Sequence, residues 1–167
     1  VENSSVRQSY ATGAVTGNDD VGGLVGRFEG TGTISQSYAT GAATILASSS
    51  YRHVGGLVGQ MWGGLIEQSY ATGKVSVPAT PNARPGGLVG YQVSGDVRNS
   101  YWDTYTTGQA NGRANTTSPR EFGVTAVTSN PAQSSAANYA YKASAYANLG
   151  VVATSLDPGA GWYMVEG

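Results

Sequence analysis

Few side chains in this sequence are of the types that carry out catalysis. The chain has no cysteine, and His53 is the single histidine among its 167 residues. A Ser-His-Asp triad needs a histidine between two defined partners, and a zinc site needs several histidine or cysteine ligands. No spacing around His53 supplies either set, so we expect His53 to be an ordinary surface side chain.

The carboxylates are scattered along the chain. Asp96 and Asp103 lie close together in sequence, and a glycosidase or lyase would need such a pair facing each other in a cleft. Asp19 and Asp20 are adjacent, but calcium requires several oxygens converging on one point, so a solvated turn is expected there. The sequence therefore predicts a protein that is not an enzyme and that has neither a cofactor nor a metal ion.

The composition excludes two further classes of function. Nine basic and ten acidic residues leave a net charge of −1, and only 11% of the residues are charged. A nucleic-acid-binding protein or a polybasic membrane-surface protein would carry a strong positive patch. No stretch approaches the ~18 apolar residues of a membrane-spanning helix, so no transmembrane segment is expected.

Two five-residue blocks alternate along the chain at a nearly constant spacing, and this periodicity is the strongest signal in the sequence. The tyrosine block, Ser-Tyr-Ala-Thr-Gly, occupies residues 9–13, 37–41 and 69–73. The glycine block, Gly-Gly-Leu-Val-Gly, occupies residues 22–26, 55–59 and 86–90. An altered tyrosine block begins at Ser100, and no glycine block follows it. The array therefore degenerates there, as a terminal repeat does.

Repeats of this length contain short strands that cannot bury an apolar face alone, and they gain a continuous core by stacking. The sequence predicts an all-β fold, a right-handed parallel β-solenoid of about three to four coils with a C-terminal α-helical cap. We assign the solenoid to residues 1–109, and an irregular final coil or loop to residues 110–130. A capping helix and a short strand are expected within residues 131–167.

The tail carries its own signals. Asn130 is a candidate N-cap, Pro131 suits the first helical position, and Gly150 follows an alanine-rich run, so a helix is expected over 131–148. Trp162 begins an apolar stretch to Val165 that is expected to form a short strand.

Side-chain parity within the tyrosine blocks separates two faces of a strand, because successive side chains point to opposite sides. The simplest arrangement turns the alanines inward and stacks the tyrosines and threonines in outward ladders, while the opposite arrangement stays open. Exposed tyrosine rings could bind sugars or another protein, although rings that only cover the coil are the simpler expectation. The candidate binding residues are Tyr10, Tyr38, Tyr70, Tyr101, Trp102, Thr12, Thr40 and Thr72.

The stretch between the two blocks differs in length and content from one repeat to the next. It covers residues 16–21, 44–54 and 76–85. Variable insertions of this kind form loops on one side of a solenoid. If the chain has binding specificity, these loops are another place for it.

The alternation of the two blocks resembles the GLUG repeat of large bacterial exoproteins, which include filamentous-haemagglutinin-like adhesins and some surface proteases. Residues 99–109 resemble the closing segment after such repeats in two-partner-secreted adhesins, and residues 161–167 resemble what comes next. The resemblance implies a segment of a larger polypeptide, secreted or held at the bacterial cell surface in association with the outer membrane. It carries over no catalytic residue, since the His-Glu-x-x-His pattern of a zinc peptidase is absent.

Two functions are consistent with this resemblance. The first is a structural or adhesive segment, or a stalk, that mediates attachment to cells, to biofilm or host surfaces, or to glycans. The second is a non-catalytic solenoid that accompanies a secreted peptidase or a polysaccharide-acting enzyme. Expected partners are glycans or proteins of host or bacterial surfaces.

Overall fold

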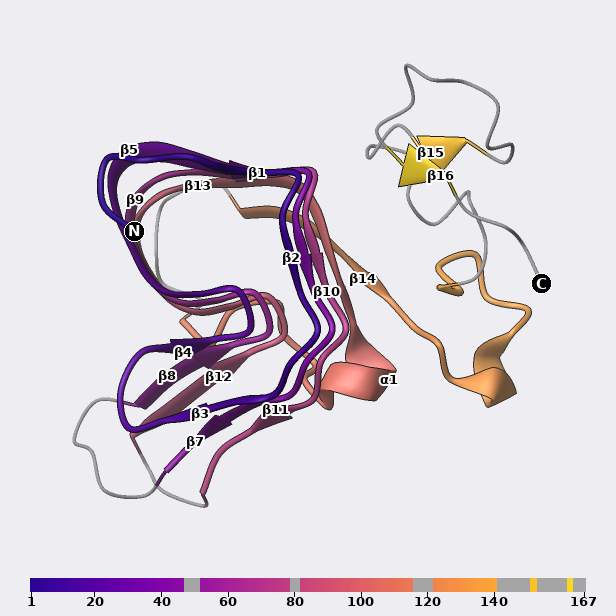
Figure 1. Ribbon diagram of the computed structural model, residues 1–167. Helices are drawn as coiled ribbons and strands as arrows, with labels where there is room; N and C mark the ends of the chain where they lie inside the picture. Colours follow the sequence, from indigo (N-terminus) through magenta and orange to yellow (C-terminus); the bar gives the residue numbers. More distant parts are fainter. Residues whose placement is uncertain (47–51, 79–81, 116–121, 141–150, 153–161, 164–167) are drawn as a thin grey trace.

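Parallel strands stacked in columns make up most of the described chain. The computed structural model describes residues 1–46, 52–78, 82–115, 122–140, 151–152 and 162–163. Every strand pairing within these residues is parallel, so successive repeats lie on one another in register (Figure 1). The predicted β-helix-like all-β architecture is therefore present.

Three sheets form the walls of the stack. The long sheet contains β1 (Val6–Arg7), β5 (Val25–Ser35), β9 (Val58–Glu67), β13 (Val89–Asp103) and β14 (Phe122–Val127), together with β2 (Tyr10–Ala11), β6 (Tyr38–Ala39) and β10 (Tyr70–Ala71). A second sheet contains β3 (Val15–Gly17), β7 (Ala43–Ile45) and β11 (Val75–Ser76). A third contains β4 (Val21–Gly22), β8 (Arg52–Gly55) and β12 (Ala83–Gly86).

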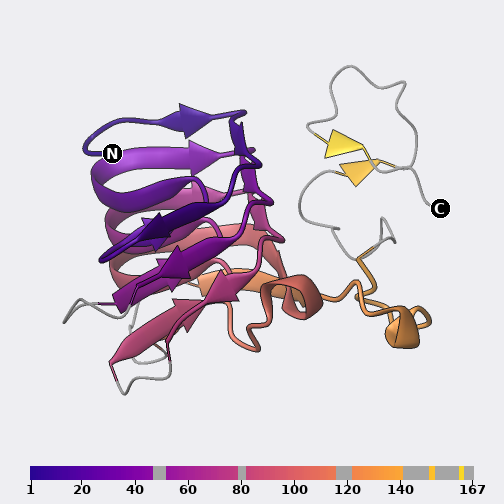
Figure 2. The same ribbon diagram turned by 60° about the horizontal axis from the view of Figure 1, so that its bottom comes forward.

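The coils advance in one rotational sense. In Figure 1 the first coil runs along β1, turns down β2, returns along β3, doubles back along β4 into the interior, and then reaches β5. Apart from this inward turn the path is clockwise, and the later coils lie farther from the viewer, as Figure 2 shows from another angle. The path is therefore that of a right-handed solenoid.

A column of buried serines stabilises the corner before each tyrosine. The Ser37 hydroxyl donates to the carbonyl of Ser35 (2.8 Å) and accepts from the backbone N–H of Ser9 in the adjacent coil (3.2 Å). Ser69 repeats the arrangement, accepting from the N–H of Ser37 at 3.2 Å. A tight corner leaves backbone groups without strand partners, and these hydroxyls satisfy them. The serine of the tyrosine block is thus a structural residue.

The glycine blocks form an inward turn that reaches the opposite wall of the coil (Figure 1). A Cβ placed on Gly56 would lie 2.7 Å from the Cβ of Ala71 and 2.2 Å from the carbonyl oxygen of Gly87. A Cβ on Gly23 would meet the Cβ of Ala39 at 2.8 Å. Such distances leave no room for a side chain, so glycine and alanine are required because two walls of the coil touch here. We call this contact the pinch.

The pinch divides the interior into two apolar cores. The larger core lies between the long strands and the tyrosine blocks, and it includes Phe28, Ile34, Leu57, Met61, Ile66, Leu88 and Val97. The smaller core lies between the second and third sheets, and it includes Val21, Ala43, Ile45, Val54 and Val75. The predicted inward orientation of the alanines is confirmed, since Ala39 and Ala71 are fully buried.

The stack continues beyond residue 109. The backbone N–H groups of Gly87 and Leu88 donate to the carbonyls of Asn111 (2.9 Å) and Gly112 (2.8 Å). β14 then pairs with β13 from Val97 to Asp103. A regular strand therefore lies within residues 110–130, which lack the sequence repeat. A short helix, α1 (Thr104–Thr107), follows β13 and precedes this part of the chain. The buried Asp103 carboxylate caps the N-terminus of α1.

The helix expected over 131–148 is wrong for the residues that the structure describes. Asn130 caps a helix as predicted, but that helix is the short 3₁₀ turn η1 (Pro131–Gln133). The backbone of residues 138–140 instead bonds to Thr128, with Thr128 N–H donating to Asn138 (3.1 Å) and Ala140 N–H donating to Thr128 (2.8 Å). Pairing with the end of β14 has overridden the helical propensity of the alanines.

The rest of the predicted tail is described only in part. Residues 141–150 lie outside the described residues. β16 (Trp162–Tyr163) agrees with the expected strand at its first two positions and pairs with β15 (Val151–Val152). Residues 164–165 of that expected strand also lie outside the described residues.

Candidate functional site

The tyrosines of the three intact blocks form a stacked column. Tyr10, Tyr38 and Tyr70 are in register on β2, β6 and β10. Their ring centroids are 5.2 Å and 4.9 Å apart, with interplanar angles of 9° and 3°. Tyr10 is 65% exposed, and the other two rings are half-buried. The predicted outward ladder of tyrosines is therefore present.

Face-to-face stacking changes what this ladder can bind. Each internal ring face is covered by the next ring, so the column presents ring edges and hydroxyls, and the exposed Tyr10 lies at its end. Burial, with a smaller contribution from Tyr38, raises the pKa of Tyr70 to about 12. The hydroxyl of Tyr70 therefore remains protonated at physiological pH. Sugar stacking needs an open aromatic face, and Tyr10 is the exposed member of the column.

The threonines follow the tyrosines at the corner. Thr12 and Thr40 are exposed and Thr72 is half-buried. The N–H of Thr40 donates to Ala11 and that of Thr72 donates to Ala39, both at 3.0 Å. Their backbones thus hold the corner together across coils.

Tyr101 and Trp102 do not extend the exposed ladder. Tyr101 pairs with Tyr70 in register, but it is only 1% exposed. Trp102 occupies the inward alanine position, is 6% exposed, and donates its indole N–H to the carbonyl of Gln109 (2.9 Å). Their selection as surface binding residues is corrected, because both side chains are buried: Trp102 belongs to the larger core, and Tyr101 is covered at the outward tyrosine position.

A charged column that the sequence analysis missed lies immediately before the glycine blocks. His53 is in register with Arg84, and Asp20 precedes Val21, the partner of Val54. A second column, Arg27, Gln60 and Tyr91, follows the glycine blocks. The two columns meet outside the inward turns. Aligning the repeats on their first glycine would have placed each set in one column.

The contacts between these columns bury a histidine and a carboxylate together. His53 Nδ1 lies 2.8 Å from Asp20 Oδ1, and Arg27 Nε donates to Asp20 Oδ2 at 2.6 Å. The His53 ring stacks on Tyr91 at 4.8 Å, and the Arg84 guanidinium lies over the same ring at 4.7 Å. His53 is 5% exposed, so its expected surface position is wrong, and Asp20 does not lie in a solvated turn.

Burial and hydrogen bonding oppose each other at Asp20. Burial alone raises the pKa of the carboxyl, but the hydrogen bonds from His53 and Arg27 and the charge of Arg27 outweigh it and lower the pKa. The carboxylate is therefore ionised at neutral pH and fixes both partners. Asp20 thus links Arg27 and His53 across adjacent coils, and this arrangement supports a structural role.

We expect Asp20→Asn to lower the free energy of unfolding at neutral pH by about 2 kcal/mol, because hydrogen bonds to a charged acceptor are lost. The folded-state pKa lies below the ordinary value of 3.8, so the carboxylate's stabilisation is complete above that value and disappears as the pH falls further. The difference between the proteins should narrow in acid. Urea unfolding across this pH range measures it.

Asp96→Asn is the matched control. Asp96 pairs with Arg98 at 3.3 Å on the surface, where both side chains are well exposed. A surface pair contributes little, so the change should stay within about 0.5 kcal/mol at every pH. Equal pH profiles for Asp20→Asn and the wild type would contradict the assignment. Asp96 and Asp103 have separate partners: Asp96 pairs with a surface arginine, and Asp103 caps the start of α1.

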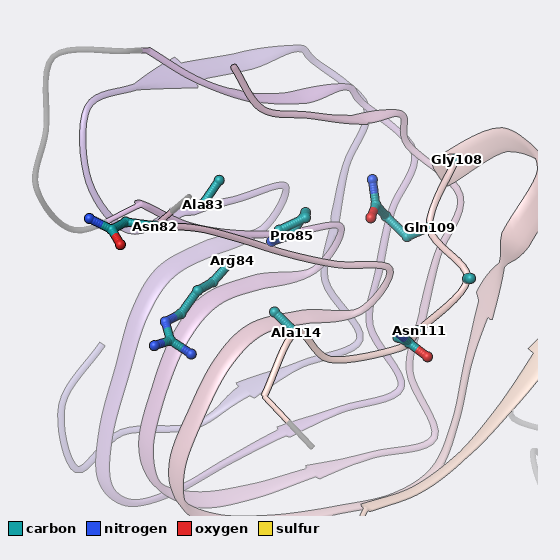
Figure 3. A pocket seen from close by; sticks show the side chains of 9 residues that line it. Asn82, Ala83, Arg84, Pro85, Gly108, Gln109, Asn111 and Ala114 are labelled. Atoms are coloured by element: carbon teal, nitrogen blue, oxygen red, sulfur yellow. The ribbon is translucent and has the colours of Figure 1, made fainter. Parts of the chain in front are cut away.

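A pocket of about 570 Å³ lies at the C-terminal end of the smaller core. Figure 3 shows Asn82, Ala83, Arg84 and Pro85 on one side and Gln109 and Asn111 on the other. Among the described strands, the second sheet ends at β11 and the third sheet ends at β12. Residues 108–111 run directly to the position beneath the glycine block at 86–90, and the pocket is the space left beside them. Gln109 Nε2 donates to the carbonyl of Val75 at 3.2 Å and so caps β11. The polar side chains of the lining are the amides of Asn82, Gln109 and Asn111 and the guanidinium of Arg84.

The described part of the chain contains no group of three or more His, Cys, Asp or Glu side chains placed to hold a metal ion. Among the same residues, no helix combines the length and apolar character needed to cross a membrane.

The chain is similar to one known sequence family. Residues 17–45 and 50–76 match the family described as the GLUG motif. Each matched segment contains one glycine block followed by one tyrosine block, so the predicted GLUG resemblance is confirmed for these two copies. The motif occurs in extracellular proteins. Neither the curated proteins nor the solved structures show a match to this chain.

Proposed function

We propose that this chain is a non-catalytic structural and adhesive segment of a larger bacterial protein exported to the cell surface. The observation that carries the proposal is the continuous in-register stack, in which Tyr10, Tyr38 and Tyr70 pack ring on ring. Stacking in which each coil contacts its neighbours gives a rod with a repetitive surface, which suits a stalk. The two GLUG motifs support an extracellular location, secreted or associated with the outer membrane.

The adhesive part of the proposal assigns binding to glycans or to proteins of host or bacterial surfaces. The variable loops and the end of the tyrosine ladder offer surfaces for it. Because few residues of the chain are charged, contacts made through aromatic and hydroxyl groups are favoured as the binding mode, and contacts made through a polybasic surface are not.

A binding screen against glycans and matrix proteins tests the adhesive role. We expect the wild-type chain to bind a subset of these targets and the variant Tyr10→Ser/Tyr38→Ser/Tyr70→Ser to lose that binding. Circular dichroism must first show that the variant keeps its β-structure, because two of the rings are half-buried. The single change Tyr10→Ser, at the exposed end, provides a milder second variant. No binding by the folded wild type would refute adhesion and leave a passive spacer.

A further inference from the structure

A second aromatic surface lies on the long sheet, away from the tyrosine blocks in sequence. Trp62 on β9 is 49% exposed although tryptophan is normally well covered. Its cross-strand neighbours are Glu29 on β5 and Ser94 on β13, both polar. The indole is therefore a single flat apolar surface in polar surroundings. The polar side chains on the neighbouring strands do not cover it, so about half of the residue is exposed to water.

Trp62 forms one wall of a pocket of about 400 Å³. The other lining residues are Glu2, Arg27, Glu29 and Gly30. Gly30 has φ +81°, and a Cβ there would lie 2.0 Å from Asn3 Oδ1, so the backbone itself forms this part of the wall. A tryptophan ring beside carboxylate and guanidinium groups combines an apolar platform with fixed hydrogen-bonding groups, which is the chemistry that recognises a pyranose ring.

The polar side of this pocket is held in place from within. Arg27 Nε donates to Asp20 at 2.6 Å, and Arg27 Nη1 donates to Glu29 Oε1 at 3.3 Å. Asp20 is itself fixed by the buried His53 at 2.8 Å. A polar group held by such partners loses little conformational entropy when it binds a ligand. The buried charged column thus positions two of the pocket's side chains.

The charge of the pocket selects among sugars. Glu2 and Glu29 contribute two carboxylates, and the cationic Arg27 is already paired with Asp20 and Glu29. A uronic or sialic acid would bring its own carboxylate toward these groups and be repelled. A neutral pyranose brings hydroxyls that can donate to the carboxylates and an apolar face that can lie on the indole.

From these observations we propose that Trp62, Glu29 and Arg27 form a binding subsite for a neutral sugar unit of a polysaccharide. The proposal rests on the adhesive part of the proposed function and names its ligand class, but it uses a surface separate from the tyrosine ladder. A subsite for one sugar unit is expected to bind in the millimolar range, and repeated copies of a surface protein would raise the avidity.

Saturation-transfer NMR and fluorescence titration of the full chain test the subsite. The probes are cellohexaose, maltohexaose and chitohexaose as neutral sugars, and an oligogalacturonate as the acidic one. We expect at least one neutral probe to bind and the oligogalacturonate to bind more weakly. Trp62→Ala should weaken the neutral interaction about tenfold or more, and Trp62→Phe should recover part of it because an aromatic face remains. Glu29→Gln should improve relative binding of the acidic probe.

Tyr105→Ser is the matched control, because it removes an aromatic ring that is 56% exposed and belongs to neither binding surface. Unchanged neutral-sugar binding in this variant supports the subsite, whereas loss in Tyr10→Ser with retention in Trp62→Ala overturns it and assigns sugar binding to the ladder. No neutral probe binding to the folded wild type also overturns the subsite, even if the chain still binds matrix proteins. A Trp62-dependent dimer in light scattering would overturn it by assigning the indole to a protein interface.

Discussion

Gly56→Ala lowers the free energy of unfolding by about 3 kcal/mol, at the upper end of the cost of overpacking a core. The new methyl group would lie 2.2 Å from the carbonyl oxygen of Gly87 and 2.7 Å from the Cβ of Ala71. Both neighbours are backbone or attached directly to it, so neither can move away by changing a rotamer. The coil must open at the pinch, which separates layers on both sides of it. Urea unfolding followed by circular dichroism measures the loss.

Gly13→Ala provides the control, because a Cβ at Gly13 would meet nothing within 4 Å. Gly13 ends the first tyrosine block, whereas a Cβ at the equivalent Gly41 would lie 2.0 Å from the carbonyl oxygen of Gly13. We expect Gly13→Ala to change stability by less than about 0.5 kcal/mol. Adding Ala71→Gly to Gly56→Ala should restore part of the loss, since one of the two close contacts disappears. Full stability of Gly56→Ala alone would show that the walls do not touch.

The pinch also explains why the repeat could be predicted while the shape of its coil could not. The alternation of the two blocks indicated stacking, and the parity of the tyrosine block placed Ala39 and Ala71 inside. The repeat spacing and the alternation of side chains are local patterns of the sequence, however. They do not indicate which side chains face each other across the interior of a coil. The contact of Gly23 with Ala39 and of Gly56 with Ala71 is long-range, so it emerged only with the coil closed.

The charged column was missed for a different reason. Asp20 and His53 each lie in a variable stretch, where a lone histidine and a pair of aspartates indicate exposed side chains. A stacked fold places residues one repeat apart in contact, and both stand two positions before the first glycine of a glycine block. Their pairing at 2.8 Å follows from that alignment. In a repeat protein, the environment of a residue is therefore set by the residues at the same position in the neighbouring repeats.

The tail shows where local signals lose to tertiary pairing. Asn130 and Pro131 do begin a helix, but Asn138 donates its side-chain amide to the carbonyl of Ala126 at 3.1 Å and the chain turns back along the end of β14. Serine and asparagine within the alanine-rich run favour turns and caps. β14 itself escaped detection because Phe122–Val127 belongs to no repeated block, and its pairing depends on the exposed edge of β13.

Trp102→Ala is expected to lower the free energy of unfolding by about 4 kcal/mol, the scale of a large-to-small change in a core. Trp102 stands where earlier repeats have alanine, and its ring occupies the space next to Gly87, whose added Cβ would lie 2.0 Å from Trp102 Cδ1. The ring also reaches Gly112 in the final segment and the carbonyl of Gln109. The indole therefore joins the last repeat to the chain beneath it, and its loss leaves a cavity between them.

Two tryptophan variants separate this role from a binding role. Trp102→Phe keeps most of the volume but loses the hydrogen bond to Gln109, so an intermediate loss of about 1–2 kcal/mol is expected. Trp62→Ala removes a half-exposed indole and should cost less than about 1 kcal/mol. If Trp102→Ala unfolds at the same urea concentration as Trp62→Ala, the terminal tryptophan is not part of the core. If Trp102→Ala unfolds at a lower urea concentration than Trp62→Ala, the tryptophan that stands at the alanine position of the last repeat closes the end of the stack.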